Sequence, residues 1–117
     1  NKYVIFNGWQ KDIDKIYNKS KFFILPSLYE GLPNSLIDAI NFELVSICSD
    51  VSGVRDICGN SSLILKNKSV DELEKKMTEA VYNYKYYYQK TIIQKKKIKK
   101  FLFKNLENNV KKNILNL

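Results

Sequence analysis

Histidine is absent from this chain of 117 residues, and cysteine occurs only twice. Without histidine the chain lacks the usual ligand of catalytic zinc and the base of a His-dependent catalytic triad. Cys48 lies in an apolar stretch and Cys58 near the end of a short predicted helix. We interpret both as buried free thiols in a reducing cytosol, rather than as a disulfide or a metal site. The sequence therefore predicts no metal centre.

Long apolar runs are also lacking, and none reaches the length of a membrane-spanning helix. We expect a chain that neither crosses a membrane nor carries an export signal. Its length suffices for the core of one domain at most, without disulfides or metals to hold it together.

Acidic residues become scarce towards the C-terminus. Residues 1–84 hold ten basic and eleven acidic side chains, a net charge of −1, whereas residues 85–117 hold ten lysines and the single acid Glu107, a net charge of +9. A basic segment joined to a nearly neutral one suggests an anionic partner. A membrane surface, a nucleic acid and plain solvent all fit this pattern.

What the sequence does contain is an alternation of apolar, strand-like runs and amphipathic, helix-like runs. Continuous apolar runs such as residues 22–25 are typical of strands buried on both faces of a parallel sheet. The alternation predicts an α/β fold, a Rossmann-like doubly wound parallel sheet followed by C-terminal helices. We assign residues 1–89 to a Rossmann-like domain and 90–117 to a basic helical segment. Strands are expected at 3–6, 22–25, 44–48 and 62–65, and helices near 12–17, 33–42, 54–58, 69–84 and, in tandem, 90–116.

The segment after residues 22–25 has the sequence of a loop that leads into a helix. A Pro-Ser pair ends the apolar run, Glu30 and Gly31 follow, and Pro33 precedes an amphipathic run that begins at Asn34. Pro33 suits the first position of a helix, because its missing N–H would be unpaired there. The free N–H groups of such a helix end suit a bound anion, typically a phosphate. Loops after strand C-termini form the ligand-binding edge of open α/β sheets, so these residues are a candidate site.

This segment resembles the donor-binding signature of the retaining glycosyltransferases with the GT-B fold, called family 4 or group 1. Their pattern is Pro-Ser, a few residues, Glu-Gly-x-Pro, and a second acid eight positions after the Glu. Here Glu30 is followed eight positions later by Asp38, where the family usually has Glu. Residues 4–8 and 45–50 resemble the strands on either side of the signature, and the resemblance covers residues 3 to about 80.

The resemblance implies a role for each residue of the signature. Glu30 would be the catalytic residue beside the donor sugar. Asp38 would accept hydrogen bonds from the nucleotide ribose, directly or through a water, because Asp is one methylene shorter than Glu. The surrounding loop would hold sugar hydroxyls or phosphate oxygens. The further donor-binding residues implied are Gly31, Leu32, Pro33, Asn34, Ser35 and, after another predicted strand, Gly8.

Each of these positions also has an ordinary structural explanation. Glu30 could be a solvated loop acid, Asp38 a carboxylate on a solvated helix face, and Ser35 a capping hydroxyl. We favour donor binding for Glu30 and Asp38. For Gly8 a simple turn is the first explanation, and a contact with the donor is the alternative.

Three nearby positions extend or depart from the family pattern. Arg55 and Asp56 lie in a stretch, residues 51–56, that resembles the loop after the signature, where relatives often have Gly-Gly-x-x-Glu. They either line the site or form a surface ion pair. Glu43 stands where many relatives have Gly, which suggests a locally different turn.

We interpret the chain as a fragment of an enzyme: the donor-binding half of a retaining glycosyltransferase that transfers a hexose-type sugar to a polysaccharide, lipopolysaccharide or lipid-linked acceptor. The resemblance implies a UDP-linked nucleotide-sugar as the donor, no metal or other cofactor, and a setting in bacterial cell-surface polysaccharide synthesis. It also implies an N-terminal Rossmann-like domain, missing here, that clamps the donor diphosphate. The chain alone should therefore bind the donor weakly and turn over nothing. The expected place is the cytoplasm, including the inner face of the cell membrane.

Two functions of other classes stay open. An anion- or nucleic-acid-binding module would use the C-terminal lysines, but no recognised nucleic-acid motif is present and we expect no nucleic-acid partner. A non-catalytic partner subunit of sugar-nucleotide-like fold would accommodate the departures at Asp38 and Glu43. The lysines concerned are Lys90, Lys95, Lys96, Lys97, Lys99, Lys100 and Lys104.

The apolar residues among these lysines allow two placements of the C-terminal segment. Positions 98, 101, 102 and 106 fit one face of a helix that packs on the sheet. Beside so many lysines, the same residues also fit a helix at an anionic membrane surface. We expect packing to dominate, with the lysines as a solvated outer face and peripheral membrane contact as a secondary effect.

Overall fold

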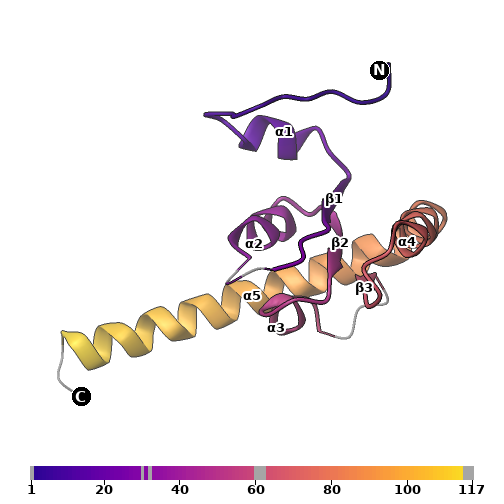
Figure 1. Cartoon of the computed structure of the whole chain (residues 1–117). Helices are drawn as coiled ribbons and strands as arrows, with labels where there is room; N and C mark the ends of the chain where they lie inside the picture. The colour runs from indigo at the N-terminus through magenta and orange to yellow at the C-terminus, as the bar shows by residue number, and fades with distance from the viewer. Residues whose placement is uncertain (1, 30, 32, 60–62, 115–117) are drawn as a thin grey trace.

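The computed structural model describes residues 2–29, 31, 33–59 and 63–114. Three parallel strands form one sheet in the order β1-β2-β3. They are β1 (Phe22–Leu25), β2 (Val45–Ser49) and β3 (Ile64–Leu65). Helices alternate with these strands along the chain (Figure 1), so the predicted α/β class with a parallel sheet and C-terminal helices is confirmed.

Helices connect the strands and follow the last of them. One crossover, between β1 and β2, contains α2, and the other, between β2 and β3, contains α3. The Ser69 hydroxyl caps the helix after β3 by accepting the Glu72 N–H at 3.1 Å, as a serine before a helix commonly does. The helices in the described part of the chain are α1 (Asp14–Asn18), α2 (Asn34–Asn41), α3 (Val54–Cys58), α4 (Val70–Tyr82) and α5 (Tyr84–Asn113).

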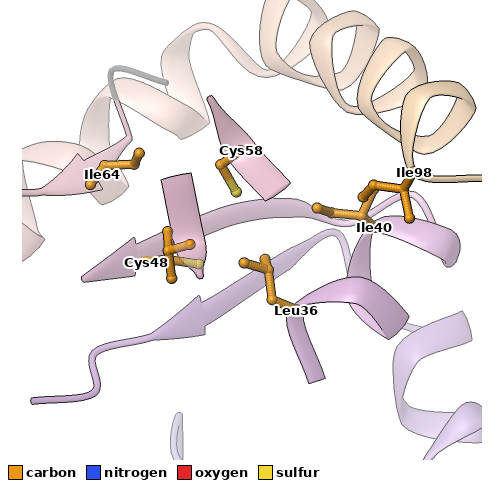
Figure 2. Packing of buried hydrophobic residues seen from close by; sticks show 7 residues of the cluster. Leu36, Ile40, Cys48, Cys58, Ile64 and Ile98 are labelled. Carbon is orange, nitrogen blue, oxygen red and sulfur yellow. The ribbon is translucent and has the colours of Figure 1, made fainter. Parts of the chain in front are cut away.

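Helices cover both faces of the sheet, as a doubly wound fold requires. On one face Cys48 and Ile64 belong to one cluster with Leu36 and Ile40 of α2, Val54 and Cys58 of α3, and Ile98 of α5, where Ile98 lies beside Ile40 (Figure 2). On the other face Val45, Ile47 and Leu65 contact Ala80 of α4 and Tyr87 of α5. The successive residues Ile47 and Cys48 of β2 thus enter opposite clusters, so both faces of the strand are covered.

The two cysteines lie in the first of these clusters as free thiols, which agrees with the sequence-based interpretation. Cys48 comes from β2 and Cys58 from the last turn of α3 (Figure 2). A hydrogen bond with the Cys58 thiol, together with burial, raises the pKa of Cys48. Since the thiolate is the reactive form, Cys48 is a structural residue rather than a nucleophile.

The strand predicted at residues 3–6 is absent: within the described range 2–12, the backbone forms turns and irregular structure. Tyr3, Phe6 and Trp9 are largely exposed there. The apolar residues of this segment favour a β-strand locally. A strand is stable only when another strand pairs with it. In the described sheet β1 pairs with β2 alone, and residues 3–6 do not pair with its other edge, so they stay irregular.

The expectation of separate helices after residue 90 is also wrong, because α5 runs without a break from Tyr84 to Asn113. This stretch contains no Gly or Pro and many good helix formers, so nothing in it ends a helix. The domain boundary proposed at residue 89 falls inside α5. Only the inner part of the helix packs on the sheet, and the outer part projects beyond it (Figure 1).

Packing of the predicted apolar face of this helix stops at Ile98, which is 8% exposed. Phe101, Leu102 and Leu106 are all exposed, so the expectation that they pack on the sheet is wrong. The sheet has only three described strands, and a helix of 30 residues, about 45 Å long, extends past them.

Candidate functional site

The loop between β1 and α2 lies at the C-terminal edge of the sheet. β1 ends at Leu25 and α2 begins at Asn34. Because β1 and β2 are parallel and in register, with Leu25 opposite Cys48, the turn after β2 lies at the same edge. Glu30 and Leu32 lie outside the described residues, so the roles predicted for them stay predictions.

The start of α2 is formed by the backbone of Pro33. The buried Pro33 has φ −79° and ψ 78°, and its carbonyl oxygen accepts the N–H groups of Leu36 and Ile37 at 3.0 and 3.3 Å. Pro33 is therefore the N-cap and not, as predicted, the first helical residue. The N–H groups of Asn34 and Ser35 have no partner within the helix itself, so this end of α2 offers donors to an anion.

Gly31 occupies a position where the fold does not require glycine. It is exposed, and a Cβ atom built on it would meet no described atom within 4 Å. Its backbone is also outside the left-handed region that Gly8, at φ +63°, adopts. Glycine loses more conformational freedom on folding than any other residue. A glycine with neither a steric nor a backbone reason is consistent with a ligand that approaches the main chain closely.

Asp38 lies on α2 about one turn after Asn34, with an exposed side chain. Tyr17 of α1 is close to this end of α2, because its hydroxyl donates to the Ser35 carbonyl oxygen at a long 3.5 Å. Burial, and then the carboxylates of Asp38 and Asp14, raise the pKa of Tyr17. The structure thus brings Ser35, Asp38 and Tyr17 together. Sequence reasoning did not single out Tyr17, and no spacing to the signature could have revealed it.

The turn after β2 is fixed by an ion pair. The Arg55 guanidinium donates to both carboxylate oxygens of Asp50, through Nε at 2.8 Å and an Nη atom at 2.7 Å. This hydrogen-bonded pair holds the pKa of Asp50 below its ordinary value. Of the two roles considered for Arg55, the structure shows the ion pair, with Asp50 as its partner. Asp56 is exposed in the first turn of α3.

Glu43 follows α2 in a backbone conformation that favours glycine. Its φ is +64°, in the left-handed region where glycine is usual. The locally different turn suggested by the sequence stays a prediction. The carboxylate accepts hydrogen bonds from the Tyr88 hydroxyl at 2.7 Å and from Lys95 Nζ at 3.0 Å. Glu43 thus ties the end of α2 to α5.

Gly8 does not join the loop after β1. It belongs to the segment before α1, which lies on the far side of α1 from that loop (Figure 1). Its positive φ supports the explanation as a turn residue, and a contact with a donor stays a prediction.

Two hollows in the described part of the chain lie away from this loop. One lies between β2 and α5 beside Leu63 and Thr91, and the other lies where α4 meets α5 beside Tyr82 and Tyr86.

Within the described residues, acidic and cysteine side chains do not gather in a group of three that could ligate a metal ion. The same part of the chain contains no helix with the length and apolarity needed to span a bilayer.

A comparison with known protein families identifies the family of the chain. The family described as "Glycosyl transferases group 1" matches residues 1–83, which include the loop and α2. The chain belongs to the group 1 glycosyltransferases. The predicted membership of the group 1 glycosyltransferases is thereby confirmed.

Individual relatives are also glycosyltransferases. Over 52 residues, 44% of this chain, it is 38% identical to the UDP-Gal:alpha-D-GlcNAc-diphosphoundecaprenol alpha-1,3-galactosyltransferase of Escherichia coli. Over 57 residues, 48% of the chain, it is 39% identical to TuaC of Bacillus subtilis (strain 168), named as a glycosyltransferase of teichuronic acid biosynthesis. It is 25% identical over 63 residues, 54% of the chain, to the O-antigen chain mannosyltransferase B of Escherichia coli. The matched residues span 13%, 15% and 16% of these proteins. No solved structure matches the chain.

Proposed function

We propose that this glycosyltransferase chain is the donor-binding half of a retaining enzyme, and that the loop between β1 and α2 holds a UDP-linked hexose-type sugar. The observation that carries the proposal is the helix start at Pro33. Two N–H groups that α2 does not use lie there beside an unconstrained glycine, at the C-terminal edge of a parallel sheet. The name of the galactosyltransferase relative supports UDP as the nucleotide.

Each residue of the loop then has a task in the transfer. Glu30 lies beside the donor sugar, Asp38 accepts the ribose hydroxyls, and the N–H groups of Asn34 and Ser35 receive phosphate or sugar oxygens. As the bond between the anomeric carbon and the diphosphate oxygen breaks, its electron pair goes to the diphosphate. Fixed N–H donors at the positive end of α2 stabilise that developing charge. The sugar centre takes on oxocarbenium character, and the acceptor hydroxyl adds on the same face while its proton passes to the departing diphosphate oxygen.

The opposite side of the site belongs, in this proposal, to an N-terminal Rossmann-like domain. That domain would supply the basic clamp for the diphosphate and the acceptor site, and no metal would be needed. The names of the relatives support a polysaccharide, lipopolysaccharide or lipid-linked acceptor, because one acts on a diphosphoundecaprenol-linked sugar and another on an O-antigen chain. Such acceptors place the enzyme in the bacterial cytoplasm, at the inner face of the membrane.

Calorimetric titration with UDP tests the proposal on this chain. We expect weak binding of UDP that Asp38→Ala reduces at least tenfold, and that Gly31→Ala reduces without lowering the thermal unfolding midpoint. Glu30→Ala, which removes the contact with the sugar, should reduce binding at least tenfold when the titrant is a UDP-hexose. Asp38→Glu should bind as tightly as the wild type or more tightly. The matched control is Glu74→Ala, which removes an exposed carboxylate on α4, away from the loop.

Three results would contradict the proposal. One is a wild-type chain that binds no UDP at millimolar concentration. The second is a control as weak as Asp38→Ala, since any acidic residue would then serve. The third is a large loss of affinity in Asp38→Glu, which would mean that Asp38 has another role.

A further inference from the structure

The outer half of α5 is an exposed helix that extends beyond the body of the fold. Residues 99–113 continue α5 past the buried Ile98, and every one of them is exposed. At 1.5 Å per residue this segment is about 22 Å long. In Figure 1 it is the yellow end of the helix, directed away from the sheet.

Four apolar side chains share one face of this segment. They are spaced by three, four and four residues, the spacing of a single helical face, and the last follows the final helical residue. All are exposed, and the first of them is 71% exposed and the second 63%. We call these residues the distal face: Phe103, Leu106, Val110 and Ile114.

The distal face does not point towards the sheet. Ile98 marks the side of α5 that is buried against the fold. At about 100° per residue, Leu106 lies about 80° and Val110 about 120° around the helix from Ile98. The body of the molecule therefore leaves the distal face accessible to a flat partner.

The charge around the distal face is mostly positive. Lys100, Lys104 and Lys111 follow one another at helical spacing along the neighbouring side of the helix. The sole acidic residue in this segment, Glu107, forms an ion pair with Lys111 at 2.9 Å. The apolar and basic side chains of the outer helix thus complement a surface with an anionic outer layer over an apolar interior.

Self-association through a coiled coil does not fit this segment. A heptad seam through the distal face would occupy positions 96, 99, 103, 106, 110 and 113. Positions 96 and 99 hold Lys and position 113 holds Asn, so fewer than two heptads are apolar, too few for a coiled coil. A nucleic-acid backbone would engage the lysines but would leave the distal face without a use.

We propose that the outer half of α5 binds the surface of an anionic lipid membrane. The helix lies in the plane of the interface, with the distal face in the boundary between headgroups and acyl chains. Its lysines lie at the level of the lipid phosphates. This proposal does not depend on the sugar site, because none of its residues belongs to the loop between β1 and α2.

Flotation of the whole chain with vesicles tests the proposal. We expect binding to vesicles of phosphatidylcholine and phosphatidylglycerol (7:3) at low salt, and at least a tenfold loss with pure phosphatidylcholine or in high salt. Phe103→Ser should weaken binding at least fivefold. Its matched control is Phe101→Ser, an equally exposed phenylalanine about 160° away around the helix. The control should change binding less than twofold.

A second pair of variants tests the charge. Lys100→Gln, Lys104→Gln and Lys111→Gln together should reduce binding to the anionic vesicles at least tenfold. Lys11→Gln, Lys19→Gln and Lys75→Gln together remove the same charge from exposed positions elsewhere and should reduce it far less. No flotation at low salt would overturn the proposal. Equal effects of the two phenylalanine variants would overturn it too, since the attraction would then be general and would not involve the distal face.

Discussion

Glu43 shows how one side chain can offset an unfavourable backbone. Its φ of +64° costs any residue other than glycine some strain, yet its carboxylate joins Tyr88 and Lys95 across the end of α2. Glu43→Ala keeps the strain and loses both contacts, whereas Glu43→Gly relieves the strain. We therefore expect the free energy of unfolding of the Gly variant to exceed that of the Ala variant by about 1 kcal/mol. In a denaturant titration the Gly variant should unfold at the higher concentration. Equal stability of the two variants would contradict this explanation of the turn.

The same carboxylate predicts a dependence of stability on pH. Hydrogen bonds from Tyr88 and then Lys95 hold the pKa of Glu43 below its ordinary value of 4.5. The folded state therefore takes up the proton less readily than the unfolded state. The resulting stabilisation is fully present above pH 4.5 and is lost as the pH falls through the lower folded-state value. Glu43→Gln should thus lower the thermal unfolding midpoint at pH 7 but much less at pH 3. Glu74→Gln, at an exposed position of α4, should change the midpoint little at either pH. A constant difference between wild type and Glu43→Gln would refute this.

Among the elements, α5 divides sharply at Ile98. Ile98 belongs to the cluster around Leu36 and Cys48, whereas Leu106, eight residues further on, is 63% exposed. Ile98→Ala should therefore cost about 2–4 kcal/mol in free energy of unfolding, as large-to-small changes in a core do. Leu106→Ala, a control of similar size on the same helix, should cost under about 0.5 kcal/mol. Similar losses in urea denaturation would mean that the outer helix packs on the fold.

The elements also show what the sequence could predict. Residues 22–25 were predicted exactly as a strand because a continuous apolar run has few alternatives in an alternating α/β pattern. Residues 3–6 have a comparable composition, but their state depends on a partner strand that local sequence does not reveal. The continuity of α5 through residue 90 was missed, although residues 84–113 contain no Gly or Pro that would end a helix. For the site, the spacing of the signature predicted the loop and α2, while the pair of Arg55 with Asp50 needed the fold.

At the scale of the whole molecule, the residues matched to the relatives span 13–16% of those proteins, and the proposed function depends on where the nucleotide binds. The most direct measurement is mapping of amide chemical shifts while UDP is added to the isotope-labelled chain. The account predicts concentration-dependent shifts at Gly31 and residues 34–38, with residues 90–104 unchanged in moderate salt. Shifts confined to the lysine-rich residues 90–104, with the loop between β1 and α2 unaffected, would contradict it.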